Sequence, residues 1–169
     1  GALGAADRIK LVAVDLNAIP LTDGFVGPRS AEMQQALRKL NLRTPLGSTD
    51  MIAALQGAID SYGPASENPR SVVYIGDGVS RANVIEGKEF EALVGELVAR
   101  RASVSSMAIG PSRDGRLLAT LANHTGGMLY VDSDQNTGQD AGLAMAHAAR
   151  GSVLWPVAAK LPSSIRESY

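Results

Sequence analysis

Short apolar runs alternate with helical patterns along most of this chain, and that alternation limits the possible folds more than any other feature. The apolar runs, which predict strands, lie at residues 9–14, 18–21, 72–75, 104–109 and 128–131. The segments with apolar residues at helical spacing predict helices at about 30–40, 49–62, 90–101, 117–123 and 139–149. Strands that alternate with helices usually pair in parallel, so the sequence predicts an α/β fold with a mostly parallel sheet.

Polar residues mark the starts of two predicted helices. Ser30 precedes a run with Met33 and Leu37 at helical spacing and is the predicted N-cap of the first helix. Thr49 or Ser48 is the predicted N-cap of the second helix, whose inward residues are predicted to be Ile52, Leu55 and Ile59. We expect Asp50 to interact favourably with the dipole of that helix. The run at 72–75 is wholly apolar, which predicts a strand buried on both faces.

The length of 169 residues suits one α/β domain with a proper core. We assign residues 1–150 to this domain. Residues 151–169 contain a strand-like run interrupted by Pro156, and we assign them to an extension or a linker to a following module. The pattern of alternating strands and helices changes beyond Gly151.

Composition excludes several classes of protein. With a net charge of −1 and dispersed basic residues, the chain lacks the basic surface of a nucleic-acid-binding protein. It contains no apolar run approaching the roughly 18 residues of a membrane-spanning helix. Because the chain has no cysteine, disulfides, thiolate metal sites and cysteine nucleophiles are also excluded.

Thr49 and Asp77 form the chain's candidate metal site. Thr49 provides a hydroxyl at the start of a predicted helix, and Asp77 provides a carboxylate at the carboxyl end of a predicted strand. The 28 residues that separate them leave room for one helix and one buried strand, so both can lie at the same edge of a parallel sheet. Such oxygen ligands suit a hard divalent cation. The alternatives are that Thr49 only caps a helix and that Asp77 and Gly78 form an ordinary turn.

Four segments, in the right order, resemble the von Willebrand factor type A domain. Residues 7–14 resemble its second strand, 44–50 its threonine loop, 73–78 its aspartate loop and 121–130 its last helix and strand. The resemblance implies a three-layer, doubly wound, Rossmann-like sheet with helices on both faces. It also implies a metal-ion-dependent adhesion site that binds magnesium, calcium or manganese, with an open coordination position that accepts a carboxylate from a protein ligand.

One motif of the family is missing. In the family, an aspartate followed at alternate positions by two serines ends the first strand and supplies most of the direct ligands. The nearest candidate here is Asp15 with Asn17 and Ile19, and only 34 residues separate Asp15 from Thr49, too few for the elements that should intervene. We therefore expect that the first strand and helix lie before Gly1 or that the fold is rearranged without them. In either case the sheet would lack its central strand, and metal binding would be weak or absent.

The resemblance favours a protein-binding module of a larger, bacterial protein and not an enzyme. The expected cofactor is a divalent cation, with Mg²⁺ as the first choice and Ca²⁺ or Mn²⁺ as alternatives, and the expected partners are an acidic side chain of a protein ligand and other domains of the same parent chain. The compartment is not determined, although an extracytoplasmic or membrane-associated parent is slightly favoured. A metal-free scaffold domain is the first alternative. The second is a Rossmann-like enzyme that binds a phosphate or nucleotide at residues 44–49.

Overall fold

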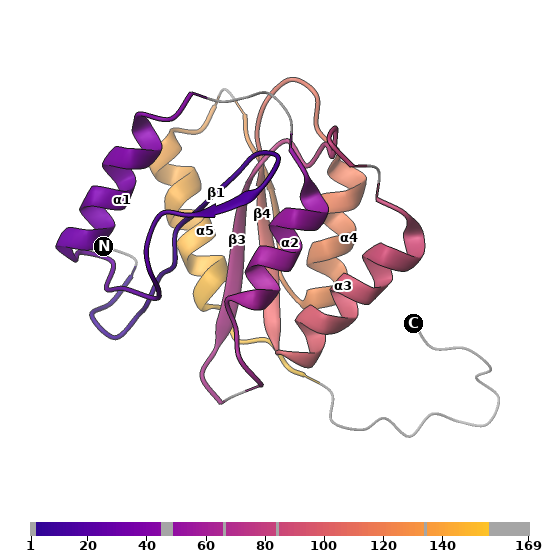
Figure 1. The fold of residues 1–169 in the computed structure, drawn as a ribbon, viewed down its shortest axis with the longest axis horizontal. Helices are drawn as coiled ribbons and strands as arrows, with labels where there is room; N and C mark the ends of the chain where they lie inside the picture. Colours follow the sequence, from indigo (N-terminus) through magenta and orange to yellow (C-terminus); the bar gives the residue numbers. More distant parts are fainter. Residues whose placement is uncertain (1–2, 45–48, 66, 84, 134, 156–169) are drawn as a thin grey trace.

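The computed structural model describes residues 3–44, 49–65, 67–83, 85–133 and 135–155. Five strands and five helices lie in this part of the chain (Figure 1). The strands are β1 (Val12–Val14), β2 (Ala18–Pro20), β3 (Arg70–Gly76), β4 (Ala102–Ala108) and β5 (Leu129–Val131). The helices are α1 (Ala31–Asn41), α2 (Met51–Asp60), α3 (Gly87–Ala99), α4 (Gly115–Thr125) and α5 (Gly138–Arg150).

Three parallel strands in the order β3-β4-β5 form the main sheet. β3 and β4 pair along their whole length, from Arg70 opposite Ala102 to Gly76 opposite Ala108. β5 pairs with the last three residues of β4. Because parallel strands need long crossover connections, α3 joins β3 to β4 and α4 joins β4 to β5. The predicted α/β fold with a parallel sheet is confirmed.

Helices cover both faces of this sheet, which gives the three layers of a doubly wound Rossmann-like fold (Figure 1). On one face, α2, α3 and α4 pack together and against β4 in the main hydrophobic core. On the other face, α5 contacts all three strands, with Ala141 and Met145 buried. All residues of β4 except Met107 are buried, because helices cover both of its faces and strands pair with both of its edges. None of the helices in the described ranges is long and apolar enough to cross a membrane.

The first two strands form a separate antiparallel hairpin, with Val12 opposite Pro20 and Val14 opposite Ala18. The hairpin attaches to the rest of the domain through α2. Gly57 allows this close approach, because a Cβ atom there would lie only 2.7 Å from the Cβ of Ala18. Among the described residues, β1 pairs only with β2, and β3 pairs only with β4.

Most predicted elements are confirmed within a few residues, including Ser30 as the N-cap of α1, where its Oγ accepts a hydrogen bond from the backbone N–H of Met33 at 3.1 Å. The prediction that the strand at 72–75 is buried on both faces is wrong. Val73 is 39% exposed and Ile75 is 60% exposed. Among the described residues β3 pairs only with β4, so it lies at an edge of the sheet and is less completely covered than β4.

Two further predictions differ from the structure or lie outside it. Residues 151–155 form no strand, and residues 156–169 lie outside the described ranges. In α2 the predicted inward residues Leu55 and Ile59 are buried and Ile52 packs against the core while partly buried, and Met51, which was not predicted, is fully buried as well. Met51 lies on the same helix face as Leu55 and Ile59 because successive residues of the three are four positions apart.

Leu97 of α3 is fully buried in the main core, so its truncation tests the importance of that core. We expect Leu97→Ala to lower the free energy of unfolding by about 2–5 kcal/mol, because the lost burial and the resulting cavity both cost stability. The measurement is urea-induced unfolding followed by circular dichroism. Leu42→Ala is the matched control, since Leu42 is 83% exposed and its truncation should change stability little.

Candidate functional site

The loop that follows β3 holds Asp77 in a defined position. Its Oδ1 accepts a hydrogen bond from the backbone N–H of Val79 at 3.0 Å, and its backbone oxygen accepts one from Asp114 at 2.8 Å. Gly78 has a φ of 73°, and a Cβ atom there would lie 2.8 Å from a side-chain carbon of Leu118. Glycine is therefore required at this position for both backbone conformation and space. The loop presents the Asp77 carboxylate at the carboxyl end of the sheet.

Thr49 is placed beside the same loop by backbone pairing. It forms an isolated parallel bridge with Ser80, and its backbone oxygen accepts hydrogen bonds from Arg81 and Ala82. The Oγ of Ser80 also accepts a hydrogen bond from the backbone N–H of Met51 at 3.1 Å. The structure thus brings the two predicted ligands, Thr49 and Asp77, to one edge of the sheet.

Ser80 is a site residue that the sequence analysis missed. It lies three residues beyond Asp77, and both its backbone and its side chain hold the start of α2 against the aspartate loop. The only signal in the sequence is a serine shortly after the Gly76-Asp77-Gly78 turn. That signal is weak because serine is common near turns.

Asp50, and not Thr49 or Ser48, is the N-cap of α2. Its Oδ1 accepts a hydrogen bond from the backbone N–H of Ala53 at 2.9 Å, and its backbone oxygen accepts one from Ala54. The prediction that Thr49 caps the helix is therefore wrong, because Thr49 pairs with Ser80 instead. Ser48, the other predicted cap, lies outside the described residues. Aspartate and the two hydroxyl residues are all good N-caps, so the pairing of Thr49 decides which residue caps the helix.

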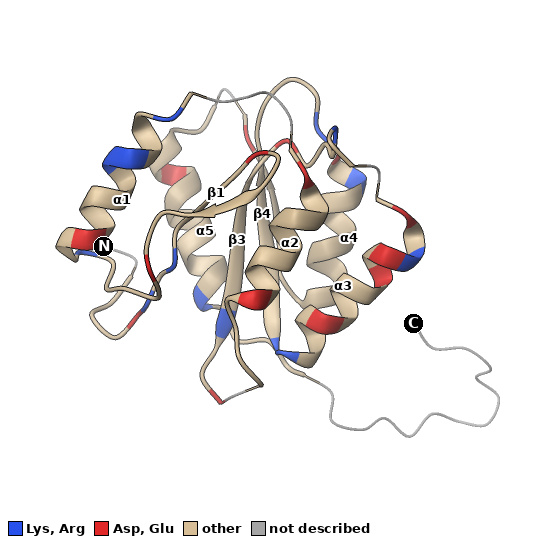
Figure 2. Ribbon diagram, in the orientation of Figure 1, with Lys and Arg blue, Asp and Glu red and all other residues tan. Residues whose placement is uncertain are grey.

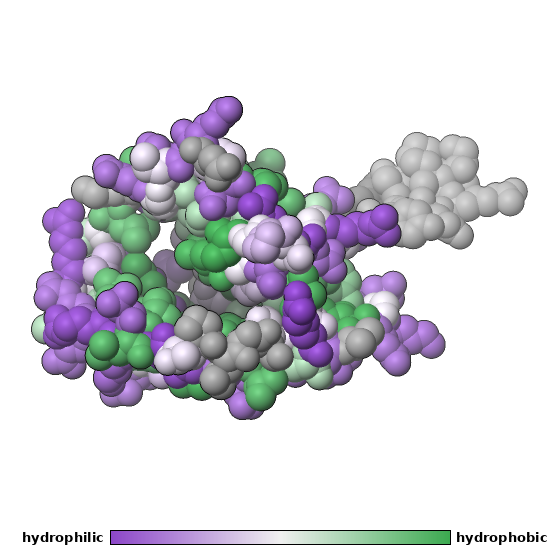
Figure 3. Space-filling view, turned by 90° about the horizontal axis from the view of Figure 1, so that it is seen from above, coloured by the Kyte–Doolittle hydropathy of each residue, from purple (hydrophilic) through white to green (hydrophobic). Residues whose placement is uncertain are grey.

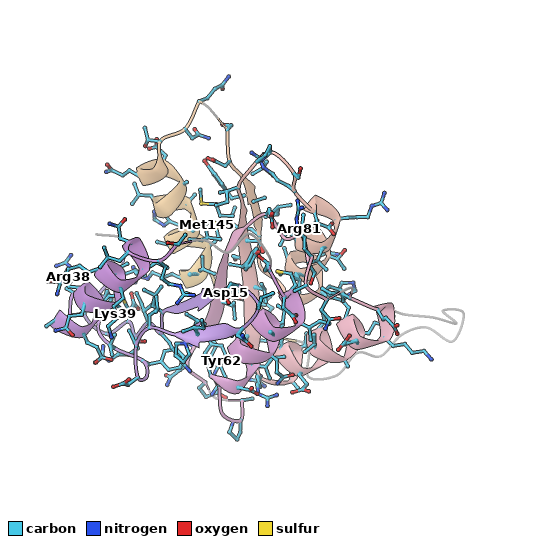
Figure 4. The ribbon with its side chains drawn as sticks, turned by 45° about the horizontal axis from the view of Figure 1, so that its top comes forward. Asp15, Arg38, Lys39, Tyr62, Arg81 and Met145 are labelled. Carbon is cyan, nitrogen blue, oxygen red and sulfur yellow. The ribbon has the colours of Figure 1, made fainter. Side chains whose placement is uncertain are left out.

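Asp15 directly follows β1 at the same edge but is already paired. Its carboxylate forms a salt bridge with Arg43 at 2.6 Å and accepts a hydrogen bond from the backbone N–H of Asn17. Its backbone oxygen accepts a hydrogen bond from Asp50 at 2.8 Å, which joins the hairpin to the start of α2 (Figure 4). In this arrangement Asp15 and Asn17 stabilise the hairpin, and the pairing with Arg43 makes Asp15 a poor substitute for the missing metal-binding motif.

Acidic residues are common along this edge of the sheet (Figure 2). Several of them have structural roles, since Asp50 caps α2, Asp114 caps α4 and Asp15 pairs with Arg43. In the described ranges, no three acidic, histidine or cysteine side chains gather as a metal-binding group. A hard cation such as Ca²⁺ takes six to eight oxygen ligands. Thr49 and Asp77 could supply two of them, and water or a further segment would have to supply the rest.

The comparisons with known proteins agree on one fold. A family model described as "von Willebrand factor type A domain" matches residues 1–131. Among solved structures, a von Willebrand factor type A protein from Catenulispora acidiphila has a TM-score of 0.73 and 15% identity, and the match covers 89% of this chain and 35% of that one. This chain therefore spans about a third of that structure's length.

Two other similar structures come from different organisms. An aerotolerance-related membrane protein from Bacteroides fragilis has a TM-score of 0.63 and 15% identity, with 84% of this chain and 80% of that one covered. Manganese-loaded TRAP protein from Plasmodium vivax has a TM-score of 0.59 and 14% identity, with 86% and 58% covered. At these identities the likeness establishes the fold alone. The comparison with curated proteins gives no match.

Replacement of Asp50 tests which residue caps α2. We expect Asp50→Ala to lower the free energy of unfolding by about 1 kcal/mol, because the N–H of Ala53 loses its partner. Thr49→Val, which removes a hydroxyl but keeps the branched shape, should cost less. The measurement is chemical unfolding of both variants, and a larger loss for Thr49→Val would contradict this assignment of the cap.

The partly buried hydroxyl of Tyr74 makes the stability of the protein depend on pH at high pH. Burial raises the pKa of its hydroxyl above the usual value of about 10, and Asp77 adds to the increase although the hydrogen bond from Gly78 opposes it. Because the folded state holds this proton more tightly than the unfolded state, its contribution to stability is present below pH 10 and is lost as the pH rises above that value. We expect Tyr74→Phe to lose stability less steeply than wild type above pH 10 in thermal unfolding measurements.

Proposed function

The chain belongs to the von Willebrand factor type A family, and on this ground we propose that it is a protein-interaction module of a larger bacterial protein. Domains of this family generally serve protein interactions. The two bacterial structures reported above support a bacterial parent, and the short span of this chain on the Catenulispora structure supports a parent with additional domains. We propose no enzymatic activity for this domain.

We further propose that Thr49 and Asp77 contribute to a divalent-cation site at the carboxyl edge of the sheet. The supporting observation is the parallel bridge between Thr49 and Ser80, which holds the threonine loop against the aspartate loop. Hydroxyl and carboxylate oxygens suit Mg²⁺, with Ca²⁺ or Mn²⁺ as alternatives, and a solved structure with the same fold is manganese-loaded. The bound cation would present an open coordination position to an acidic side chain of the protein partner.

The side chains of Thr49 and Asp77 each keep an oxygen that makes no hydrogen bond within the described residues. Within the described ranges, the Thr49 hydroxyl makes no hydrogen bond, and only one of the two Asp77 carboxylate oxygens accepts one. Both residues are partly exposed. Their oxygens are therefore accessible to a cation and its water ligands, whereas the Asp50 and Asp15 carboxylates are held by other groups.

The alternative of a phosphate-binding enzyme has less support. A phosphate at the start of α2 would need free backbone N–H groups in the first turn. Met51 already donates to Ser80, and Ala53 donates to the Asp50 carboxylate, whose negative charge would repel a phosphate. A metal-free scaffold domain is the stronger alternative, because three of the carboxylates near this edge serve the fold itself.

Thermal unfolding in different divalent ions tests the proposed cation site. We expect Mg²⁺ or Mn²⁺ to raise the unfolding temperature relative to EDTA, since a ligand that binds only the folded state adds about 2.7 kcal/mol at a hundredfold excess over its Kd. Asp77→Asn should abolish the rise while keeping the oxygen that accepts the hydrogen bond from Val79. Sodium chloride at matched ionic strength controls for general screening.

Asp23→Asn is the matched control for the loss of one negative charge. Asp23 is exposed and lies beyond β2, on a segment that runs away from the candidate site. This variant should respond to the ions as wild type does. Absence of any rise in the wild-type protein, or an equal rise in Asp77→Asn, would contradict the cation site and favour the metal-free scaffold.

A further inference from the structure

Three exposed arginines, Arg81, Arg113 and Arg116, lie on the loops around Asp77 and are called the arginine rim below. Arg81 lies on the connection from β3 to α3, and its backbone N–H donates to the oxygen of Thr49 at 3.1 Å. Arg113 precedes α4, and Arg116 lies in its first turn. Figure 2 shows basic residues at the start of α4 and on the loop before it. The rim therefore borders the candidate cation site.

Close contacts hold the two loops of the rim together. The backbone N–H of Asp114 donates to the oxygen of Asp77 at 2.8 Å. A Cβ atom at Gly78 would lie 2.8 Å from a side-chain carbon of Leu118, and one at Gly110 would lie 4.0 Å from the Cβ of Asp77. Figure 3 looks onto this edge from above and shows hydrophilic side chains reaching out from the half of the molecule that carries α3 and α4.

The rim lies on the β4 side of Asp77. The strand order of the main sheet is β3-β4-β5, so β4 is the neighbour of β3 on the side away from the hairpin. Arg113 and Arg116 belong to the connection from β4 to α4. A further strand between the hairpin and β3 would therefore lie on the opposite side of β3 from these two arginines.

The fold does not use the charges of the rim. In the part of the chain that the structure describes, none of the three rim side chains makes an ion pair or a hydrogen bond. By contrast, Arg43 pairs with Asp15, and Arg100 pairs with Glu96. Arg116 also lies in the first turn of α4, where a positive charge interacts unfavourably with the helix dipole. The three guanidinium groups are therefore available to a ligand.

The chemistry of the rim suits carboxylates. A guanidinium group can donate two parallel hydrogen bonds to one carboxylate, which a lysine ammonium cannot do. The two aspartates of these loops are partly buried and already accept hydrogen bonds, Asp77 from Val79 and Asp114 from Leu117. The exposed charge of the two loops is therefore positive, which favours an acidic ligand.

We propose that the arginine rim binds an acidic segment of the partner protein, whose carboxylates pair with Arg81, Arg113 and Arg116. This inference rests on the proposed role in protein interaction and names the chemistry of the partner, but the rim binds the segment without a cation. A cation at Asp77 would add positive charge beside the rim. The cation and the acidic segment would then each strengthen the binding of the other.

Other anionic ligands fit the rim less well. A nucleic acid carries a charge on every phosphate and would bring some of them against Asp77 and Asp114, whereas a peptide can place its carboxylates opposite the arginines alone. An anionic membrane surface is bound by clusters of about four to eight basic residues, more than the rim contains. Glu86 and Glu89 are exposed at the start of α3, and they limit the acidic ligand to the side of the rim that borders α4.

Titration of the ¹⁵N-labelled protein with a synthetic peptide, followed by NMR in EDTA, tests the proposal. In the probe peptide glutamates alternate with serines, and in its control glutamines replace the glutamates. We expect saturable shifts of the backbone amide signals of Arg81, Arg113 and Arg116 with the acidic peptide, and none with the control. The affinity should fall as the salt concentration rises, because exposed charges are screened. Saturable shifts confined to another surface would overturn the proposal.

A pair of double variants separates the rim from general charge. We expect Arg113→Gln with Arg116→Gln to raise the Kd for the acidic peptide about tenfold, through the loss of two exposed ion pairs. Arg38→Gln with Lys39→Gln is the matched control, since both residues are exposed on α1, on the opposite side of the molecule from Arg81 (Figure 4). This control should bind as wild type does, with circular dichroism confirming that both variants fold. Equal affinity of the two double variants would overturn the proposal.

The peptide experiment and the metal experiment fail separately. Peptide binding in EDTA without any stabilisation by divalent ions would remove the cation site and leave the rim. Stabilisation by divalent ions through Asp77 without peptide binding, in EDTA or in Mg²⁺, would remove the rim and leave the cation site. Tighter binding of a single-stranded oligodeoxynucleotide, or of vesicles that contain phosphatidylserine, than of the acidic peptide would also overturn the proposal.

Discussion

The parallel pairing of β3 with β4 is the interaction on which the rest of this structure depends. Its register aligns Gly76 with Ala108, so the loops that follow both strands lie at one edge of the sheet. The backbone N–H of Asp114, beyond β4, can then donate to the oxygen of Asp77, beyond β3. The bridge between Thr49 and Ser80 adds the start of α2 to the same edge. The candidate site is thus a consequence of strand register.

In the described residues the strands form two separate sheets, the β1–β2 hairpin and the β3-β4-β5 sheet. The α/β body has a continuous core, whereas the hairpin joins it through α2 and through the contacts of Asp15. The sequence analysis expected a sheet without its central strand, and in the described residues β1 and β3 belong to two separate sheets. In β3, Val73 is 39% exposed, and the Oγ of Ser71 is buried without a hydrogen-bond partner among the described residues.

The carboxylates near the carboxyl edge of the sheet can either stabilise the fold or bind a cation. Asp50 and Asp114 satisfy the first turns of α2 and α4, and Asp15 neutralises Arg43. Each of these contacts stabilises the fold and withdraws a ligand that a cation could use. Asp77 differs because its turn uses only one carboxylate oxygen. If a cation binds here, its remaining ligands must come from water or from another segment, which explains why weak binding was expected.

The sequence by itself determined the helices, the strands and the placement of Thr49 and Asp77 at one edge, because periodicity, capping and spacing along a βαβ unit are local properties. Only the tertiary structure decided that Asp50 caps α2, since three adjacent residues could have done so and the pairing of Thr49 with Ser80 selected one. The salt bridge between Asp15 and Arg43 joins residues 28 positions apart, and no local pattern predicts it. The burial of β3 was predicted wrongly for a similar reason: apolar sequence favours a strand, but the exposure of its side chains depends on which elements pack against its two faces.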